Sequence, residues 1–108
     1  MKGVRITVVK TEYYPELARE VDLTKQKGGA FTPCPIFRKG QEFIIHNIDE
    51  IPNGFCSWAW ADIERDAAMI LFGGCPQPTL KKPHSMYSCC DEGLRPVIFK
   101  LEQIEVPS

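Results

Sequence analysis

Five cysteines are the residues of this 108-residue chain best suited to chemistry: Cys34, Cys56, Cys75, Cys89 and Cys90. Cysteine thiolates bind zinc, copper(I) and iron–sulfur clusters. An odd number of cysteines without an export signal predicts free thiols rather than a disulfide framework. None of them forms a Cys-x-x-Cys pair, in which one tight turn supplies two ligands. Any shared site therefore has to be assembled by the tertiary fold.

Cys56 lies where a helix is expected to begin. Unpaired backbone N–H groups and the helix dipole favour the thiolate at such a position. Cys56 is therefore a candidate catalytic nucleophile, with Arg95 as a candidate clamp for an anionic substrate. The sequence shows no side chain that is evidently placed to act as a general base for Cys56. A thiol enzyme is the alternative to a metal site, and whether the chain is an enzyme stays open.

Cys89 and Cys90 precede a turn at the end of an expected strand. Adjacent side chains in extended backbone point to opposite faces, so only one of the two can easily join the helix-start thiol. The sequence leaves open which one does. Cys75 lies in a proline-rich loop and is left out of the expected site. His46 and His84 have no partner at metal-ligand spacing, and their roles also stay open.

Both tryptophans belong to the short stretch Cys56-Ser57-Trp58-Ala59-Trp60. Indole rings beside a thiol site would limit the access of water and tune the bound group. We therefore expect Trp58 and Trp60 to form walls of a cofactor site. The plain alternative is that the thiols and indoles only fill the core, because free cysteine is among the residue types most often buried.

The segments that position these residues follow from hydrophobic periodicity. Alternation predicts strands from 4 to about 10 and over 41–46, 86–90 and 96–102. Helices are expected over 15–21 and 55–72, the second ending at Gly73-Gly74. Residues 22–33 and 75–84 have the composition of loops. This order predicts an α+β fold, in which a small, mostly antiparallel sheet packs on one long central helix, with a short N-terminal helix. Residues 1–108 are expected to form a single domain.

The helix over 55–72 is apolar on two sides. Its broader side, which we expect to face the core, gathers Cys56, Ala59, Trp60, Ile63, Ala67, Ile70 and Leu71. The opposite side carries Trp58, Met69 and Phe72, where a solvated surface would carry more charge. Such a second apolar side favours contact with another layer or another subunit. We therefore expect a homo-oligomer that forms through Trp58, Met69 and Phe72.

Composition excludes several classes of protein. The hydrophobic fraction is 44% and the charged fraction 25%, as in ordinary globular domains. The net charge is −1 and no basic stripe is present, which argues against a nucleic-acid partner. No apolar run approaches the roughly 18 residues of a membrane span, and no signal core is found, so we expect no membrane contact and a cytoplasmic location. The common phosphate-binding and hydrolase motifs are also missing.

Three segments read CPIF…GQEF, GFCSWAW and CCDEGLRPVIFK, close to a signature of CPxF…GQxF, GFCSWAW and CCxDGLRPVxFK from which Glu92 departs. They lie at 34–43, 54–60 and 89–100. With them the chain resembles a family of small bacterial and archaeal proteins of about this length, a family without an established activity. The resemblance runs nearly end to end. The signature cysteines of the family match Cys34, Cys56, Cys89 and Cys90, and this implies a shared thiol site rather than plain packing.

The leading hypothesis is a small cytoplasmic protein with a shared thiol site. Cys34, Cys56 and one or both of Cys89 and Cys90 would bind a soft metal or an iron–sulfur cluster, with a redox-related role. The lack of zinc-knuckle spacing favours a cluster slightly over structural zinc. The alternatives are a thiol-dependent enzyme with Cys56 as nucleophile and a non-catalytic oligomerising domain with structural cysteines. The metal, any substrate and the number of subunits stay open.

Overall fold

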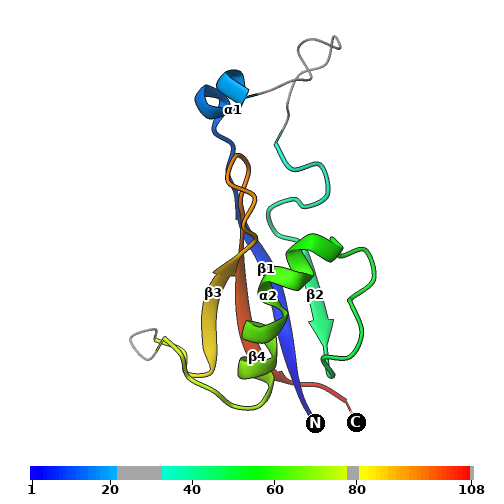
Figure 1. The fold of residues 1–108 in the computed structure, drawn as a ribbon. Helices are drawn as coiled ribbons and strands as arrows, with labels where there is room; N and C mark the ends of the chain where they lie inside the picture. The colour runs from blue at the N-terminus through cyan, green and yellow to red at the C-terminus, as the bar shows by residue number, and fades with distance from the viewer. Residues whose placement is uncertain (22–32, 78–80, 108) are drawn as a thin grey trace.

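The computed structural model describes residues 1–21, 33–77 and 81–107. Its elements are β1 (Lys2–Thr11), α1 (Pro15–Val21), β2 (Glu42–Ile45), α2 (Ser57–Leu71), β3 (Ser85–Cys89) and β4 (Val97–Glu105), as shown in Figure 1. The predicted α+β class and the order of the elements are confirmed. The expected loop over 22–33 lies, except for its last residue, outside the described residues.

The four strands form one antiparallel sheet in the order β2-β1-β4-β3. The two central strands pair so that Ile6 lies opposite Leu101 and Val8 opposite Phe99. These four side chains are fully buried on one face of the sheet. Because side chains alternate across a strand, their neighbours in sequence lie on the other face, as the period of two predicts.

Helix α2 packs across β1, β4 and β3 on the buried face of the sheet (Figure 1). Its buried residues are Ala59, Trp60, Ile63, Ala67, Ile70 and Leu71. This set matches the core side expected from the sequence, apart from Cys56, which is half-buried. α2 spans 15 residues, an ordinary length for a globular helix. None of the described helices is long and apolar enough to cross a membrane.

Two glycines fix where α2 ends. Gly73 has a φ of 88°, in the left-handed region that glycine adopts without steric cost. The N–H of Gly74 then donates to the carbonyl of Met69 at 2.8 Å, which satisfies one of the last free carbonyls of the helix. The predicted helix stop at Gly73-Gly74 is therefore confirmed.

A cluster of aromatic rings joins the sheet to the start of α2 and to the segment before β2. Its members are Phe37, Phe43, Phe55, Trp60 and Phe99. Phe37 packs edge-on against Phe55 and Phe99, with ring centroids 4.9 and 5.1 Å apart. Edge-on aromatic pairs add to the stabilisation that burial already provides. The cluster holds the two segments that carry Cys34 and Cys56 against the sheet.

Two neighbouring residues test the role of this cluster. Phe37 is 3% exposed, whereas Ile36 is 47% exposed. We expect Phe37→Ala to lower the free energy of unfolding by about 3–5 kcal/mol, because it leaves a cavity in the core. Ile36→Ala should change it by less than about 1 kcal/mol. Urea unfolding followed by tryptophan fluorescence measures both values, and equal losses in the two variants would contradict this account of the core.

Candidate functional site

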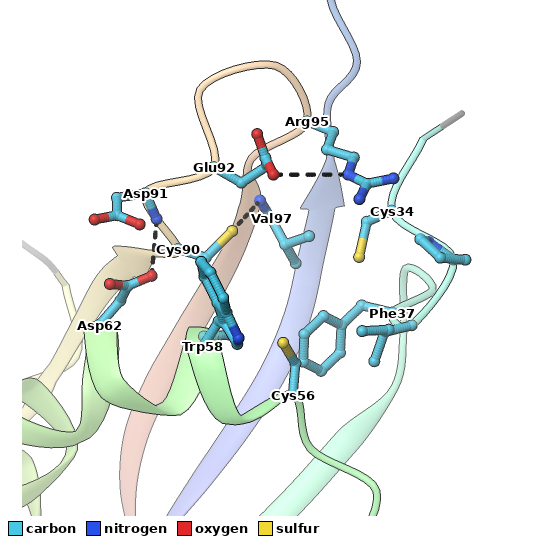
Figure 2. A pocket seen from close by; sticks show the side chains of 13 residues that line it. Cys34, Phe37, Cys56, Trp58, Asp62, Cys90, Asp91, Glu92, Arg95 and Val97 are labelled. Carbon is cyan, nitrogen blue, oxygen red and sulfur yellow. Dashed lines mark hydrogen bonds and ion pairs between the residues drawn. The ribbon is translucent and has the colours of Figure 1, made fainter. Parts of the chain in front are cut away.

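A pocket of about 530 Å³ opens between the start of α2, the turn after β3 and the segment that begins at Cys34 (Figure 2). Three of the five cysteines line it: Cys34, Cys56 and Cys90. They come from parts of the chain that are far apart in sequence. The structure therefore brings together one thiol from each of the three segments that the sequence analysis singled out.

Cys56 is the residue that immediately precedes the first turn of α2. Its backbone is extended, with φ −68° and ψ 127°, and its carbonyl accepts the N–H of Trp60 at 2.9 Å. Its side chain makes no capping hydrogen bond to the helix. The thiol is therefore available to the pocket, at the positive end of the helix dipole.

Cys90 follows β3 and continues its pairing with β4. The N–H of Cys90 donates to the carbonyl of Val97 at 3.1 Å. In return, the N–H of Val97 donates to the Sγ atom of Cys90 at 3.2 Å (Figure 2). These two contacts hold a buried sulfur atom in a defined position at the pocket wall.

Cys89 does not line the pocket, although the resemblance had placed it in the site. Its side chain is exposed, because adjacent residues of an extended chain point to opposite faces of the sheet. Partial desolvation by neighbouring groups raises the pKa of the Cys89 thiol, although the side chain is exposed, and the nearby charges of Cys90, Asp62, Asp91 and Asp66 raise it further. Cys89 therefore stays protonated to a higher pH than an ordinary thiol.

Cys34 lies three residues before Phe37, in the segment that leads to β2. It is half-buried and packs against the hydrophobic core. The anchored ring of Phe37 thus keeps Cys34 beside the start of α2, although the segment belongs to no helix or strand. Such a segment has more freedom to adjust than the strand end that carries Cys90.

The two tryptophans lie in different environments, although both were expected to be walls of the site. Trp58 lines the pocket and is 82% exposed. Trp60 is 7% exposed and packs edge-on against Phe55 in the core, outside the pocket. Trp60 is therefore a core residue, because two positions along α2 rotate a side chain by about 200° around the helix axis.

Charged side chains surround the thiols: Asp62, Asp91, Glu92 and Arg95 line the same pocket. The N–H of Asp91 donates to Asp62 Oδ2 at 2.9 Å, and Arg95 Nε lies 3.9 Å from Glu92 Oε2 (Figure 2). Three carboxylates and one guanidinium give the pocket an excess of negative charge. The sequence analysis identified only Arg95. The missed signal was that Asp62 follows Trp58 by one helical turn and that Asp91 adjoins Cys90.

The remaining candidates lie elsewhere. Cys75 is exposed in the loop after α2. His84 Nδ1 is 3.1 Å from the carbonyl oxygen of Gly74, and His46 lines a separate, shallow pocket beside β2. The lining of the thiol pocket therefore contains no imidazole.

The thiols share the pocket without forming a ready ligand set. All five cysteines are free. Over residues 1–21, 33–77 and 81–107, no group of three or more His, Cys, Asp or Glu side chains is close enough to hold a metal ion. Joint binding of one ion thus requires the thiols to move closer together.

The raised pKa of Cys89 predicts a specific pattern of alkylation. Only the thiolate reacts with iodoacetamide, so exposed Cys89 should label slowly at neutral pH and faster as the pH rises through its raised pKa. Peptide-resolved mass spectrometry across a pH series measures this, with an unstructured cysteine peptide as reference. Half-maximal labelling of Cys89 at or below the pH of the reference would contradict the expectation. Asp62→Asn should shift the curve toward the reference, because it removes one of the nearby negative charges.

Comparisons with known proteins do not assign the site to a family. No protein-family model, no curated protein and no solved structure matches this chain. The resemblance inferred from the three cysteine-bearing motifs stays a prediction, and the function has to be argued from the geometry of the pocket.

Proposed function

We propose that the pocket binds a soft metal ion, copper(I) or zinc, through the thiolates of Cys34, Cys56 and Cys90. The observation that carries this proposal is the convergence of these three side chains on one pocket from three distant segments. Thiolate sulfur is the ligand that soft metal ions prefer. The hydrogen bond from Val97 to Cys90 Sγ adds support, because such outer contacts orient ligands and tune the bound metal.

The charge of the pocket favours a cation. The pocket lining has three carboxylates, those of Asp62, Asp91 and Glu92, and one positive group. That group is the guanidinium of Arg95, which already lies beside Glu92. An excess of carboxylates attracts a metal ion and repels an anionic substrate. This distribution supports the metal site over a thiol enzyme in which Arg95 clamps an anion.

The number of thiols favours a single ion. An iron–sulfur cluster is commonly held by four cysteine thiolates, whereas three cysteines line this pocket and Cys89 lies outside it. Zinc takes four ligands, so three thiolates would leave one position for a rim carboxylate such as Asp62 or for water. A reducing cytoplasm, in which thiols stay free, is the compartment that fits such a site.

The three cysteines would then come together around one metal ion. Cys90 is the fixed member, because its sulfur and its backbone are both bonded to Val97. Cys34 and Cys56 are half-buried and would approach it by changing rotamer and by a small shift of the segment before Phe37. Trp58 stands at the pocket wall, where its ring would restrict the access of water.

Metal titration of the reduced protein tests this proposal, because the chain offers matched controls. We expect one copper(I) or zinc ion per chain under anaerobic conditions. Cys34→Ser and Cys56→Ser should each weaken binding by at least about tenfold, by analogy with the loss seen when supporting residues of metal sites are removed. Cys75→Ser and Cys89→Ser should leave the affinity unchanged. At a metal concentration about 100 times Kd, the free energy of unfolding should rise by about 2.7 kcal/mol.

Two results would contradict the metal site. One is the absence of binding by the reduced wild-type protein. The other is an equal loss of affinity in all cysteine variants, which would mean that the thiols bind metal without a defined site. Urea unfolding of each variant without metal separates lost ligands from lost folding.

A second candidate function is a thiol-dependent enzyme with Cys56 as nucleophile. The observation that favours it is the position of Cys56 at the start of α2, with its side chain in an open pocket. If this function is correct, Cys56 should be the fastest cysteine to react with iodoacetamide at neutral pH, because a catalytic nucleophile is activated relative to the other thiols of the chain. Labelling of Cys56 no faster than Cys75 would remove this candidate.

A further inference from the structure

Two carboxylates of α2 bond to the strand end that carries Cys90. Asp66 Oδ2 accepts a hydrogen bond from the hydroxyl of Ser88 at 2.6 Å. Asp62 Oδ2 accepts one from the N–H of Asp91 at 2.9 Å (Figure 2). Along the chain, these contacts lie on both sides of Cys90. They therefore hold this strand end against the helix at two points.

The two acids of α2 are four residues apart, and both are half-buried. Like charges at this spacing repel one another in an isolated helix, so the contacts with the strand end offset a local cost. Hydrogen bonds accepted by a carboxylate are also stronger than those between neutral groups. Ser88 and Cys90 share a face of the sheet, because residues two apart in a strand point the same way. The bond from Ser88 to Asp66 therefore fixes the face of the strand end that carries the pocket thiol.

Cys56 is attached to the same helix as the two acids. It directly precedes α2, whose 15 residues include Asp62 and Asp66. The sulfur of Cys90 is held in turn by the N–H of Val97 at 3.2 Å. Both thiols are thus tied to α2, Cys56 through the backbone and Cys90 through the hydrogen bonds of its strand end.

We propose that Asp62 and Asp66 are positioning residues, which set Cys56 and Cys90 as a pair of thiols at a fixed separation. A soft ion or a thiol-reactive compound that joins two sulfur atoms would find this pair in place, without the cost of bringing the two thiols together. The pair is a property of the folded, metal-free chain. It does not depend on the proposed metal function.

The third pocket thiol, Cys34, is placed in a different way. Its segment is held by the packing of Phe37 against the rings of Phe55 and Phe99. Packing has no preferred direction, whereas a hydrogen bond fixes both distance and angle. Loss of a contact between α2 and the strand end should therefore displace Cys90 relative to Cys56 and leave Cys34 where it is.

Ser88 allows a test that removes no potential ligand. Neither Ser88 nor Asp66 is among the residues that line the pocket. Ser88→Ala removes the hydroxyl that donates to Asp66, whereas Ser88→Thr keeps a hydroxyl at this position and is the matched control. An effect of Ser88→Ala on the thiols then acts through the position of the strand end.

Cross-linking of the reduced, metal-free protein with dibromobimane reports whether two thiols lie within reach of one reagent molecule. Each sulfur displaces one bromide and loses its proton, so a bridge forms two thioether bonds, and mass spectrometry separates bridged from singly alkylated protein. One background keeps only Cys56 and Cys90, and the other keeps only Cys34 and Cys56, with serine at the remaining cysteine positions. We expect Ser88→Ala to lower the ratio of bridged to singly alkylated protein by about tenfold in the first background, because bridging requires both sulfurs in position. In the second background the ratio should stay unchanged, and Ser88→Thr should keep it unchanged in both.

Three results would overturn the positioning role. They are a Cys56–Cys90 pair that is not bridged in the first background, a ratio that Ser88→Ala leaves unchanged, and an equal fall in both backgrounds, which would indicate general loosening. Urea unfolding verifies that each variant folds. If Ser88→Ala does not fold, Asp66→Ala takes its place, with Asp66→Asn as the control that keeps an acceptor oxygen. The cross-linking contains no metal, so its result is independent of the metal titrations.

Discussion

The packing of Phe37 against Phe55 and Phe99 is the contact on which the arrangement of the site depends. Phe37 belongs to the segment before β2, Phe55 to the residues just before α2, and Phe99 to β4 in the centre of the sheet. Cys34 and Cys56 lie next to two of these anchors, so their sulfurs face a common pocket because three rings share one core. Hydrophobic packing, which has no direction of its own, thereby determines where the polar chemistry of the pocket lies.

The third thiol depends on backbone pairing rather than on packing. Cys90 extends the ladder between β3 and β4 and receives a hydrogen bond on its sulfur from Val97. A shift of one residue in this register would exchange Cys90 for Cys89 at the pocket. The carboxylates of Asp62, Asp91 and Glu92 lie around the thiols. Asp62 accepts a hydrogen bond from the N–H of Asp91, the residue after Cys90, and this contact links α2 to the same strand end. The proposed soft-metal site rests on these thiols and carboxylates together.

Helix α2 is apolar on two sides. Its inner side closes the core over the sheet, and its outer side leaves two aromatic rings and Arg65 in solvent. Trp58 connects the outer side with the pocket, since it lines the pocket while most of its ring is exposed.

The sequence by itself determined the elements, the core side of α2 and the glycine stop at its end, because period, caps and turns are local properties of the chain. It also determined that Cys89 and Cys90 face opposite ways. It could not decide which of them faces the pocket, since that depends on the register between β3 and β4. The helical period put Trp60 on the core side and Trp58 on the opposite side, but it did not show that Trp58 lines the pocket while Trp60 does not, and it did not reveal the carboxylates of Asp62, Asp91 and Glu92 around the thiols. Those features depend on which distant side chains meet, and only the tertiary structure decided them, because the burial of each side chain depends on its neighbours in space.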